Sequence, residues 1–498
     1  MTDISSIQPL SDNRERMLST AMRLFILMKI AMLLVLAVNT RFVMDEFWHF
    51  SQPVYLFDGI FSTIWPKKAV GYVLFYELSH LIGWDATSML MAGRLTTAFL
   101  AIGVAFCVFK CARALGHDRL TSILAVALLL SFSNFIERGF RLRSEPLAIL
   151  FAAMAMLVVI RYEADRARTL LVAGLLSGLA FVTTQKSVYF NFSLGVALVV
   201  DAAFMLSASR ALWRGGLLII GWAGAIAIYG ALLGGAAMPQ VLKLLFLGPT
   251  EVALHGGSYY DQLDLYVWQT LQRNPLAYGL VVVGLLLSAL RFHRLESTAR
   301  IFLVFTVSLS AFVFLHNQTW PYVFTMALPF LSVYGAIALT SLKRQSTRSS
   351  TIATVILVVV AVQSFVRNAQ YLGHDNRHQL AVIQRAEVLL ADEDTYFDGI
   401  GMIPSRRMEP RLWLDAQAVE KTVEEGRQSV LYGALQRAEP RLVISTYRTD
   451  SLGDVFNTAL RANYGYLTPH IMLPLASHTH LLSVPPVRPS LFNGVYDD

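Results

Sequence analysis

The chain has 498 residues, of which 55% are hydrophobic and only 15% charged, and its mean hydropathy is +0.52. This composition lies outside the range of ordinary soluble domains. The formal charge of +7 does not indicate nucleic acid as a partner, because Arg and Lys in short cytoplasmic loops also orient membrane proteins. We therefore expect an integral membrane protein.

Apolar runs recur along the chain, and a spanning helix needs roughly 20 mostly apolar residues. The first run lacks a small-residue cleavage site, so it is interpreted as an anchor. Cys107 and Cys111 lie one helical turn apart inside an apolar run and are expected to be small core residues. We predict a polytopic α-helical membrane protein with about 11 transmembrane helices, near residues 18–38, 89–109, 119–134, 144–161, 169–184, 188–206, 214–234, 276–290, 299–315, 320–341 and 351–366.

The basic residues between these runs predict the topology. Positive residues concentrate in cytoplasmic loops, and a cytoplasmic N-terminus places every basic cluster between spans on that side: Lys110, Arg113, Arg119, Arg161, Arg166, Arg168, Arg210, Arg214, Arg291, Arg294, Lys343, Arg344 and Arg348. The opposite, outer side then holds the loops 40–88 and 235–275, three short turns and the tail.

The composition changes after residue 366. Residues 367–498 carry more charge and combine a strand-like run at 442–447 with helical patterns such as 377–391. We therefore predict a membrane domain at 1–366 and a small soluble α/β domain at 367–498 on the outer, periplasmic side. Within the first outer loop, residues 68–84 have the pattern of an amphipathic helix lying along the membrane interface.

An acidic pair follows the first apolar run. Asp45 and Glu46, with His49 close by, lie in the stretch 44–50, just past the outer end of that run. Ionisable groups clustered at a membrane face are functional candidates. Further polar groups are predicted at the same face: Arg138, Arg141 and Arg143 in the charged turn 133–145, Lys186 in a tight turn, His255 and Tyr259 in the large loop, and His316 and Tyr322 in a late turn.

These residue types suit transfer of a group from an anionic lipid carrier. Arg binds phosphate through a bidentate fork and Lys as a point charge, and both stabilise charge that develops on a departing phosphate. Asp45 is the candidate general base that takes the proton from an attacking hydroxyl, and Glu46 or His49 would orient it or the sugar.

Each of these residues also has a purely structural interpretation. An acidic pair after a spanning helix is often the solvated start of a loop, and the arginines could contact lipid headgroups or pair with Glu137 and Glu145. Lys186 could simply extend its ammonium group to the interface. The histidines in the outer loops could be packing residues. The coincidence of all these groups on one face favours a functional site.

On these residues the chain resembles the GT-C superfamily of membrane glycosyltransferases, particularly the bacterial protein mannosyltransferase and aminoarabinose transferase group. The resemblance rests on Asp45-Glu46 with His49 in the first outer loop and on the charged turn from Glu137 to Glu145. It also rests on the aromatic and proline segment at 318–329 and on a soluble domain after the last span.

This resemblance implies a sugar donor linked to polyprenyl phosphate, transfer at the periplasmic face and, usually, inversion at the anomeric carbon. Asp45 matches the position of the base, and Glu46 is its neighbour. Arg138, Arg141 and Lys186 match phosphate binders by location. The acceptor would be a hydroxyl on a lipid, glycan or protein, and the transferred sugar a hexose or pentose. Apart from the resemblance, the lack of long insertions and of a retention signal favours a bacterial inner membrane over the endoplasmic reticulum.

Other interpretations stay open at this level. The tail lacks the Trp-Trp-Asp tripeptide of oligosaccharyltransferases, which argues against transfer to an asparagine sequon. Asp45, Glu46, His49 and His255 could ligate a divalent cation, but their spacing defines no metal site. A secondary transporter or lipid flippase is an alternative function, although transporters bind substrate near mid-membrane. A third interpretation is a non-catalytic membrane subunit of a polysaccharide assembly machine.

Overall fold

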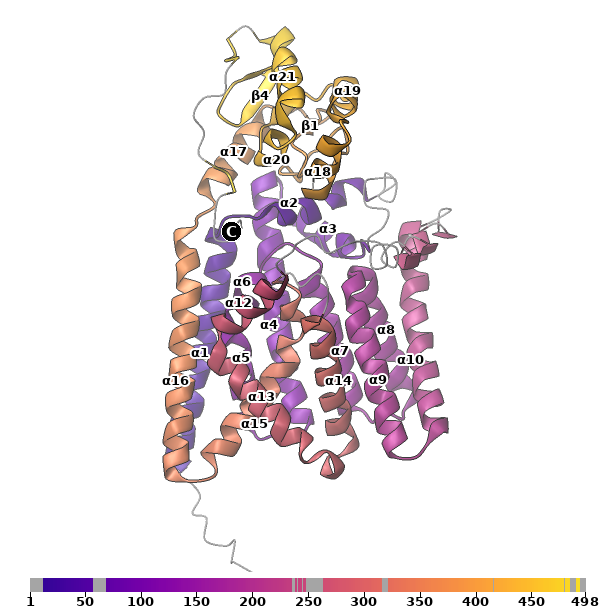
Figure 1. Cartoon of the computed structure of the whole chain (residues 1–498), viewed down its shortest axis with the longest axis vertical. Coiled ribbons are helices and arrows are strands. Elements are labelled where there is room, and N and C mark those ends of the chain that lie inside the picture. Colours follow the sequence, from indigo (N-terminus) through magenta and orange to yellow (C-terminus); the bar gives the residue numbers. More distant parts are fainter. Residues whose placement is uncertain are drawn as a thin grey trace, which may run out of the picture.

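A computed structural model describes residues 12–56, 69–234, 238–239, 241–243, 245–247, 263–315, 321–414, 416–478, 480–483 and 490–492. A helix overlaps each of the predicted spans (Figure 1): α1 (Asp12–Asn39), α4 (Ala86–Ala114), α5 (Arg119–Ser131), α7 (Glu145–Arg161), α8 (Ala167–Thr183), α9 (Val188–Phe204), α10 (Ala208–Tyr229), α13 (Pro275–Ala289), α14 (Ser297–Phe314), α15 (Leu328–Lys343) and α16 (Thr347–Ala369).

The helices differ in their capacity to cross a bilayer. Within the described part of the chain, six are long and apolar enough to do so, and α5, α8, α13 and α15 are shorter apolar helices. The predicted class, a helical membrane protein, is therefore confirmed. The count of eleven spans stays a prediction, because it depends on shorter helices that would cross only part of a bilayer or thin it locally.

Local sequence signals set several of the helix starts. Asp85 caps α4 by accepting a hydrogen bond from the Ser88 backbone N–H at 2.8 Å, and Asp118 caps α5 through the Thr121 N–H at 2.7 Å. A carboxylate in this position satisfies an N–H group that the helix leaves open. Proline occupies the first turn of α7, α13 and α15, where its missing N–H costs nothing.

Small residues allow two of the helices to approach closely. A Cβ at Gly174 of α8 would overlap the Leu218 carbonyl of α10, and a Cβ at Gly221 of α10 would overlap the Leu171 carbonyl of α8. Helices in membranes associate through such close backbone packing, because lipid tails are as apolar as the side chains. Cys107 and Cys111 are free and buried, as expected for small core residues.

The two ends of the helical bundle differ in composition. The connections α9–α10, α13–α14 and α15–α16 lie at the end opposite the C-terminal sheet (Figure 1). These connections and the helix ends beside them carry Arg210, Arg291 and Lys343 among other cations. The acidic pair, α3 and the tail lie at the other end. The basic connections between the predicted spans therefore lie at one end of the bundle, and the orientation of that end in a membrane stays a prediction.

The first outer loop contains two described helices, α2 (Met44–Phe50) and α3 (Tyr72–Ile82). On α3, Val73 and Tyr76 are buried, whereas Leu78, Leu81 and Ile82 are exposed, as is Trp84 just beyond the helix. The predicted amphipathic helix is thus present, and its exposed apolar face suits contact with a membrane surface.

The tail combines helices with a small sheet. The strands β1 (Tyr396–Phe397), β2 (Leu442–Ile444), β3 (Tyr464–Tyr466) and β4 (Ile471–Pro474) form a sheet of order β1-β2-β4-β3. The β1–β2 pair is parallel, and the other two pairs are antiparallel. The helices around it are α17 (Arg377–Val388), α18 (Ala416–Glu424), α19 (Gln428–Ala438), α20 (Tyr447–Asp450) and α21 (Gly453–Asn463).

The tail and the first outer loop share one hydrophobic core. Phe47 of α2 and Tyr55 belong to the same buried cluster as Tyr396 and Val443 of the sheet. The Tyr55 hydroxyl donates to the Met408 carbonyl at 3.1 Å and accepts from the Met408 N–H at 2.8 Å. The position of α2, and hence of the acidic pair, is therefore fixed by the C-terminal domain as well as by the membrane helices.

Candidate active site

The acidic pair lies in the first turn of the short helix α2, where the partial positive charge of a helix N-terminus favours carboxylates. The two side chains have different surroundings. Asp45 keeps 32% of its side chain exposed, whereas Glu46 is completely buried. Adjacent residues in the sequence thus face two different environments.

Glu46 is surrounded by hydrogen-bond donors. Arg94 of α4 binds it through two nitrogens, at 2.9 Å and 2.6 Å, and Arg141 binds it at 2.6 Å. The backbone N–H groups of Val43 and Leu142 add bonds of 3.0 Å and 3.2 Å. Burial alone would raise the pKa of the Glu46 carboxyl, but the two guanidinium groups and these bonds lower it to about 2. Glu46 is therefore ionised at neutral pH and holds α2 against the bundle through these ion pairs and hydrogen bonds.

Asp45 begins a chain of alternating charges. Its carboxylate pairs with Arg143, whose Nε donates to Glu145 at 3.2 Å, and Lys186 Nζ donates to the same Glu145 at 2.8 Å. The Tyr322 ring lies beside both cations, with its centroid 3.7 Å from Arg143 Cζ and 4.0 Å from Lys186 Nζ. Arg143 and Glu145 are almost fully buried, so the two ends of this chain, Asp45 and Lys186, are its accessible groups.

His49 lies one helical turn after Asp45 on α2. Its Nδ1 is 2.7 Å from the Asp45 carbonyl oxygen, and a carbonyl only accepts, so Nδ1 carries the proton. Burial, together with the nearby Arg143, lowers the pKa of His49 to about 4. The imidazole is therefore neutral at pH 7 and supports the backbone of the residue that carries the candidate base.

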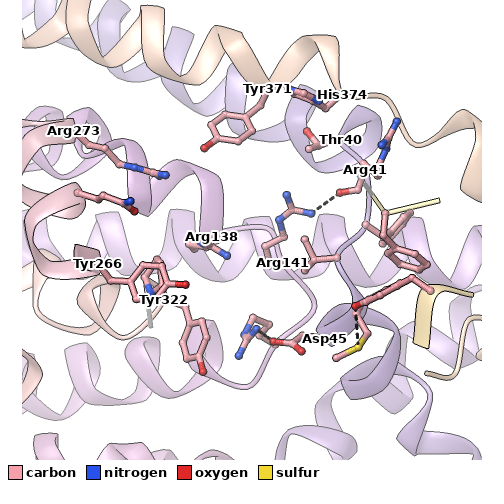
Figure 2. Close-up of a pocket in the computed structure, with 18 of the residues that line it drawn as sticks. Thr40, Arg41, Asp45, Arg138, Arg141, Tyr266, Arg273, Tyr322, Tyr371 and His374 are labelled. Atoms are coloured by element: carbon pink, nitrogen blue, oxygen red, sulfur yellow. Dashed lines mark hydrogen bonds and ion pairs between the residues drawn. The ribbon is translucent and has the colours of Figure 1, made fainter. Parts of the chain in front are cut away.

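A cavity of about 260 Å³ opens beside Asp45 (Figure 2). Figure 2 shows Arg138 and Arg141 in its middle, with Tyr266 and Arg273 on one side and Arg41 and His374 on the other. Its lining comes from segments far apart in the sequence: Thr40, Arg41, Phe42, Val43, Met44, Asp45, Arg138, Arg141, Arg143, Tyr266, Gln269, Arg273, Pro321, Tyr322, Tyr371, His374, Tyr447, Arg448 and Phe492.

The structure brings most of the sequence-predicted residues together. Asp45, Arg138, Arg141, Arg143 and Tyr322 line the cavity. Lys186 does not line the cavity, but it contacts Tyr322 of the lining and pairs with Glu145. His49 and Glu46 lie behind Asp45. His255, Tyr259 and His316 lie outside the described residues. The roles of all these side chains in catalysis or binding stay predictions.

Sequence reasoning missed four arginines of this region. Arg41, Arg273 and Arg448 line the cavity, and Arg94 lies behind it. Arg273 of α12 (Leu263–Arg273) is held by Glu137 at 2.7 Å, the partner that the structural interpretation had assigned to the arginines of the charged turn. The position of Arg94 could have been recognised from the sequence, because a cation inside an otherwise apolar run usually has a buried partner.

The described residues give no metal site. No three His, Cys, Asp or Glu side chains within the described ranges lie close enough together to hold an ion. Glu46, one of the ligands considered from the sequence, already accepts bonds from two arginines and two backbone N–H groups.

Comparison with known structures identifies the fold. ArnT from Cupriavidus metallidurans bound to undecaprenyl phosphate matches with a TM-score of 0.65 and 11% identity, over 92% of this chain and 98% of that chain. Its apo form matches with a TM-score of 0.61 and 10% identity, over 90% and 97%. The oligosaccharyltransferase AglB from Archaeoglobus fulgidus, in complex with an inhibitory peptide and a dolichol-phosphate, gives 0.56 and 12%, over 89% and 72%.

These neighbours are GT-C glycosyltransferases, so the fold that the resemblance predicted is confirmed. A family described as a domain of unknown function, DUF7056, matches residues 420–473 in the C-terminal domain. No curated protein sequence matches the chain. At identities of 10–12% the comparisons establish the architecture, and function has to be argued from the site.

Proposed function

We propose that this protein is a GT-C-type glycosyltransferase that moves a sugar from a polyprenyl-phosphate carrier to a hydroxyl acceptor. The observation that carries the proposal is the position of Asp45, a partly exposed carboxylate on the wall of a cavity. The other charged residues among the described part of its lining are arginines. Support for the lipid carrier comes from the shared fold, since ArnT binds undecaprenyl phosphate and AglB a dolichol-phosphate.

The cations suit the donor phosphate. Arg138 and Arg143 line the cavity, and a guanidinium fork matches two phosphate oxygens. Lys186 lies next to them across Tyr322. Fixed positive charge in a partly buried site stabilises the negative charge that develops on the leaving phosphate, and it does so without reorganisation during the reaction. The sequence prediction assigned phosphate binding to these three residues and to Arg141. We keep that assignment for the three, whereas Arg141 pairs with Glu46.

Asp45 is the proposed general base. The acceptor oxygen attacks the anomeric carbon of the sugar, and the hydroxyl proton passes to the Asp45 carboxylate. The bond from the anomeric carbon to the phosphate oxygen breaks, and its electron pair stays on the phosphate near the arginines. Attack from the side opposite to the phosphate inverts the anomeric configuration. Glu46 would act as a positioning residue, because it is buried behind the cavity wall and already carries five hydrogen bonds.

The proposed orientation places the site at the periplasmic face of a bacterial inner membrane. The basic connections at the opposite end of the bundle (Figure 1) support this orientation, since short loops rich in Arg and Lys stay in the cytoplasm. The acceptor, whether lipid, glycan or protein, would then reach the cavity from the side of the C-terminal domain.

The test measures release of polyprenyl phosphate by the purified full-length protein from undecaprenyl phosphate carrying a radiolabelled sugar, with an envelope extract as acceptor source. We expect Asp45→Asn to reduce the turnover by at least about 100-fold, within the usual range for a general base. Asp454→Asn, at an exposed position of α21, is the matched control and should keep full activity.

Three results would contradict the proposal. Full activity of a folded Asp45→Asn variant would show that Asp45 is not the general base, and it would favour a different catalytic group. Movement of the intact lipid-linked sugar across proteoliposomes, with no bond broken, would favour a transporter. Normal glycan and lipid profiles in cells that carry only the Asp45→Asn variant would favour a non-catalytic subunit.

A further inference from the structure

A lysine is buried inside the first membrane helix. Lys29 lies on α1, and at 1.5 Å per residue its Cα is about 15 Å from the end of the helix at Asn39. Its side chain is completely buried. A charged group at this depth is costly and, where it occurs, it usually serves a function. Lys29 has no part in the proposed reaction, so its place in the bundle calls for another explanation.

The ammonium group of Lys29 joins α1 to α16, the two helices that lie side by side in Figure 1. It donates to the Ser364 hydroxyl at 2.8 Å and to Asn368 Oδ1 at 2.5 Å, and it lies 4.9 Å from the centre of the Phe365 ring. An ammonium group only donates hydrogen bonds. It therefore fixes the orientation of the Asn368 amide, with Oδ1 toward Lys29 and the NH2 group directed elsewhere.

The NH2 group of Asn368 bonds the short helix α6 (Ser133–Arg138). Its Nδ2 donates to the Ser133 carbonyl at 3.4 Å. Asn274, which precedes α13, holds the same residue, because its Oδ1 accepts from the Ser133 backbone N–H and from the Ser133 hydroxyl, both at 2.9 Å. Asn368, Asn274 and Ser133 are all buried. Two asparagines from different helices thus hold the first residue of α6.

The other end of α6 carries charged side chains to the cavity. Arg138, its last residue, lines the cavity (Figure 2) and is a proposed binder of the donor phosphate. Glu137 and Asn134 accept hydrogen bonds from Arg273 of the lining, at 2.7 Å and 3.1 Å. A helix of six residues is too short to be stable by itself. Its position, and that of these side chains, depends on the groups that hold it.

We propose that Lys29 is a positioning residue for the donor site and that it acts through the Asn368 amide on α6, and hence on Arg138 and Glu137. This inference rests on the proposed function. Groups that bind a reacting ligand have to be held within about 0.5 Å of their productive geometry by the residues behind them. A turn of the Asn368 amide would release α6 and displace Arg138, whereas Asp45, on α2, would stay in place.

The test separates the orientation of the amide from the charge of Lys29. Asn368→Asp places a carboxylate beside the ammonium group, so the contact between α1 and α16 is kept. It also replaces the NH2 group by an oxygen that faces the Ser133 carbonyl, and two acceptors cannot bond each other. In the transfer assay with the purified full-length protein, we expect the KM for the radiolabelled donor to rise at least about fivefold, the loss expected for one hydrogen bond. The KM for the acceptor extract should change less than twofold.

Arg300→Met is the matched control for the loss of a buried ionic contact. Arg300 of α14 pairs with the buried Asp201 at 2.9 Å, at the opposite end of the bundle. Its loss should lower the Tm and leave both KM values unchanged. Lys29→Met is the second variant, and it decides the question if Asn368→Asp does not fold. It should lower the Tm as well, but it should also raise the donor KM, because the Asn368 amide can then turn.

Hydrogen exchange of the segment 132–139, measured by mass spectrometry, reports how firmly α6 is held, independently of activity. Both Asn368→Asp and Lys29→Met should speed amide exchange in this segment, and Arg300→Met should not.

Three outcomes overturn the inference: an unchanged donor KM in folded Asn368→Asp, unchanged exchange of α6 in that variant, or an equal rise of the donor KM in Arg300→Met. Faster exchange of α6 in the two variants, together with no binding of undecaprenyl phosphate to the wild type, would instead contradict the proposed donor. The role of Lys29 in holding α6 would then still stand.

Discussion

Replacing Glu46 by Gln tests whether this carboxylate holds α2 in place. The substitution keeps the shape of the side chain but removes the charge that compensates two buried guanidinium groups, and it turns an amide N–H toward an arginine donor. Removing one partner of a buried ion pair typically costs about 3–5 kcal/mol. An unfolding entropy of roughly 2 cal/mol/K per residue, applied to a chain of this length, converts this cost into a Tm decrease of about 3–5 °C.

The assay is thermal unfolding of the purified protein in detergent at several pH values, and Asp45→Asn is the matched control. Asp45 is partly exposed, so its loss should change the stability by less than about 1 kcal/mol. The folded-state pKa of Glu46, about 2, lies below its ordinary value of 4.5. Its stabilisation is therefore present above pH 4.5 and lost as the pH falls toward 2.

The Tm difference between the wild type and Glu46→Gln should follow the same pH dependence, and it should shrink in acid. Equal stability of the two proteins at pH 7 would refute the reasoning. So would a Tm decrease of the same size in Asp45→Asn, because the two carboxylates would then share one structural role.

Three further predictions concern other parts of the structure. Lys186→Met should lower kcat/KM for the donor by about 10–100-fold, because Glu145 would lose a cation and the phosphate a partner; unchanged kinetics would contradict this. The pKa of His49 in the folded protein is about 4, below its ordinary value of 6.5. The contribution of the neutral imidazole to the stability of the fold is therefore complete above pH 6.5 and is lost as the pH falls toward 4. His49→Asn should therefore show the same pH–rate profile as the wild type between about pH 5.5 and 8, and a limb near pH 6.5 found only in the wild type would argue against a neutral imidazole. Gly174→Leu should destabilise the protein by about 3 kcal/mol or more in thermal unfolding, whereas Gly195→Leu, which meets no atom within 4 Å, should be tolerated; equal effects of the two would contradict the close packing of α8 on α10.

The helical framework could be predicted because its determinants are local. A run of about 20 apolar residues is enough by itself to predict a membrane helix. Each predicted span overlaps an observed helix. The end of the bundle that carries Asp45 could be predicted for the same reason, since the end of the first run fixes where Asp45 emerges. The side of the membrane that this end faces stays a prediction from the short basic connections. Local pattern and global fold agree over most of residues 1–366.

The division of labour within the acidic pair could not be predicted. Asp45 and Glu46 are equivalent in the sequence, and their roles separate only because Arg94 and Arg141 meet one of them. Arg94 lies 48 residues after Glu46 and Arg141 lies 95 residues after it. Contacts over such separations depend on how helices pack against each other, which no local pattern determines. Arg448, about 400 residues from Met44, escaped detection for the same reason.

The placement of Asp45 follows from attachments on both sides of α2. On the bundle side, Glu46 binds Arg94 and Arg141. On the other side, Gln379 of α17 exchanges two hydrogen bonds with the backbone of Phe42, at 2.7 Å and 2.9 Å. A short helix held from opposite sides has little freedom to tilt, so the carboxylate between these attachments is preorganised toward the cavity. Because one of the two attachments belongs to the C-terminal domain, that domain is part of the proposed catalytic geometry, and weakening its docking would displace the base while the cations stay in the membrane domain.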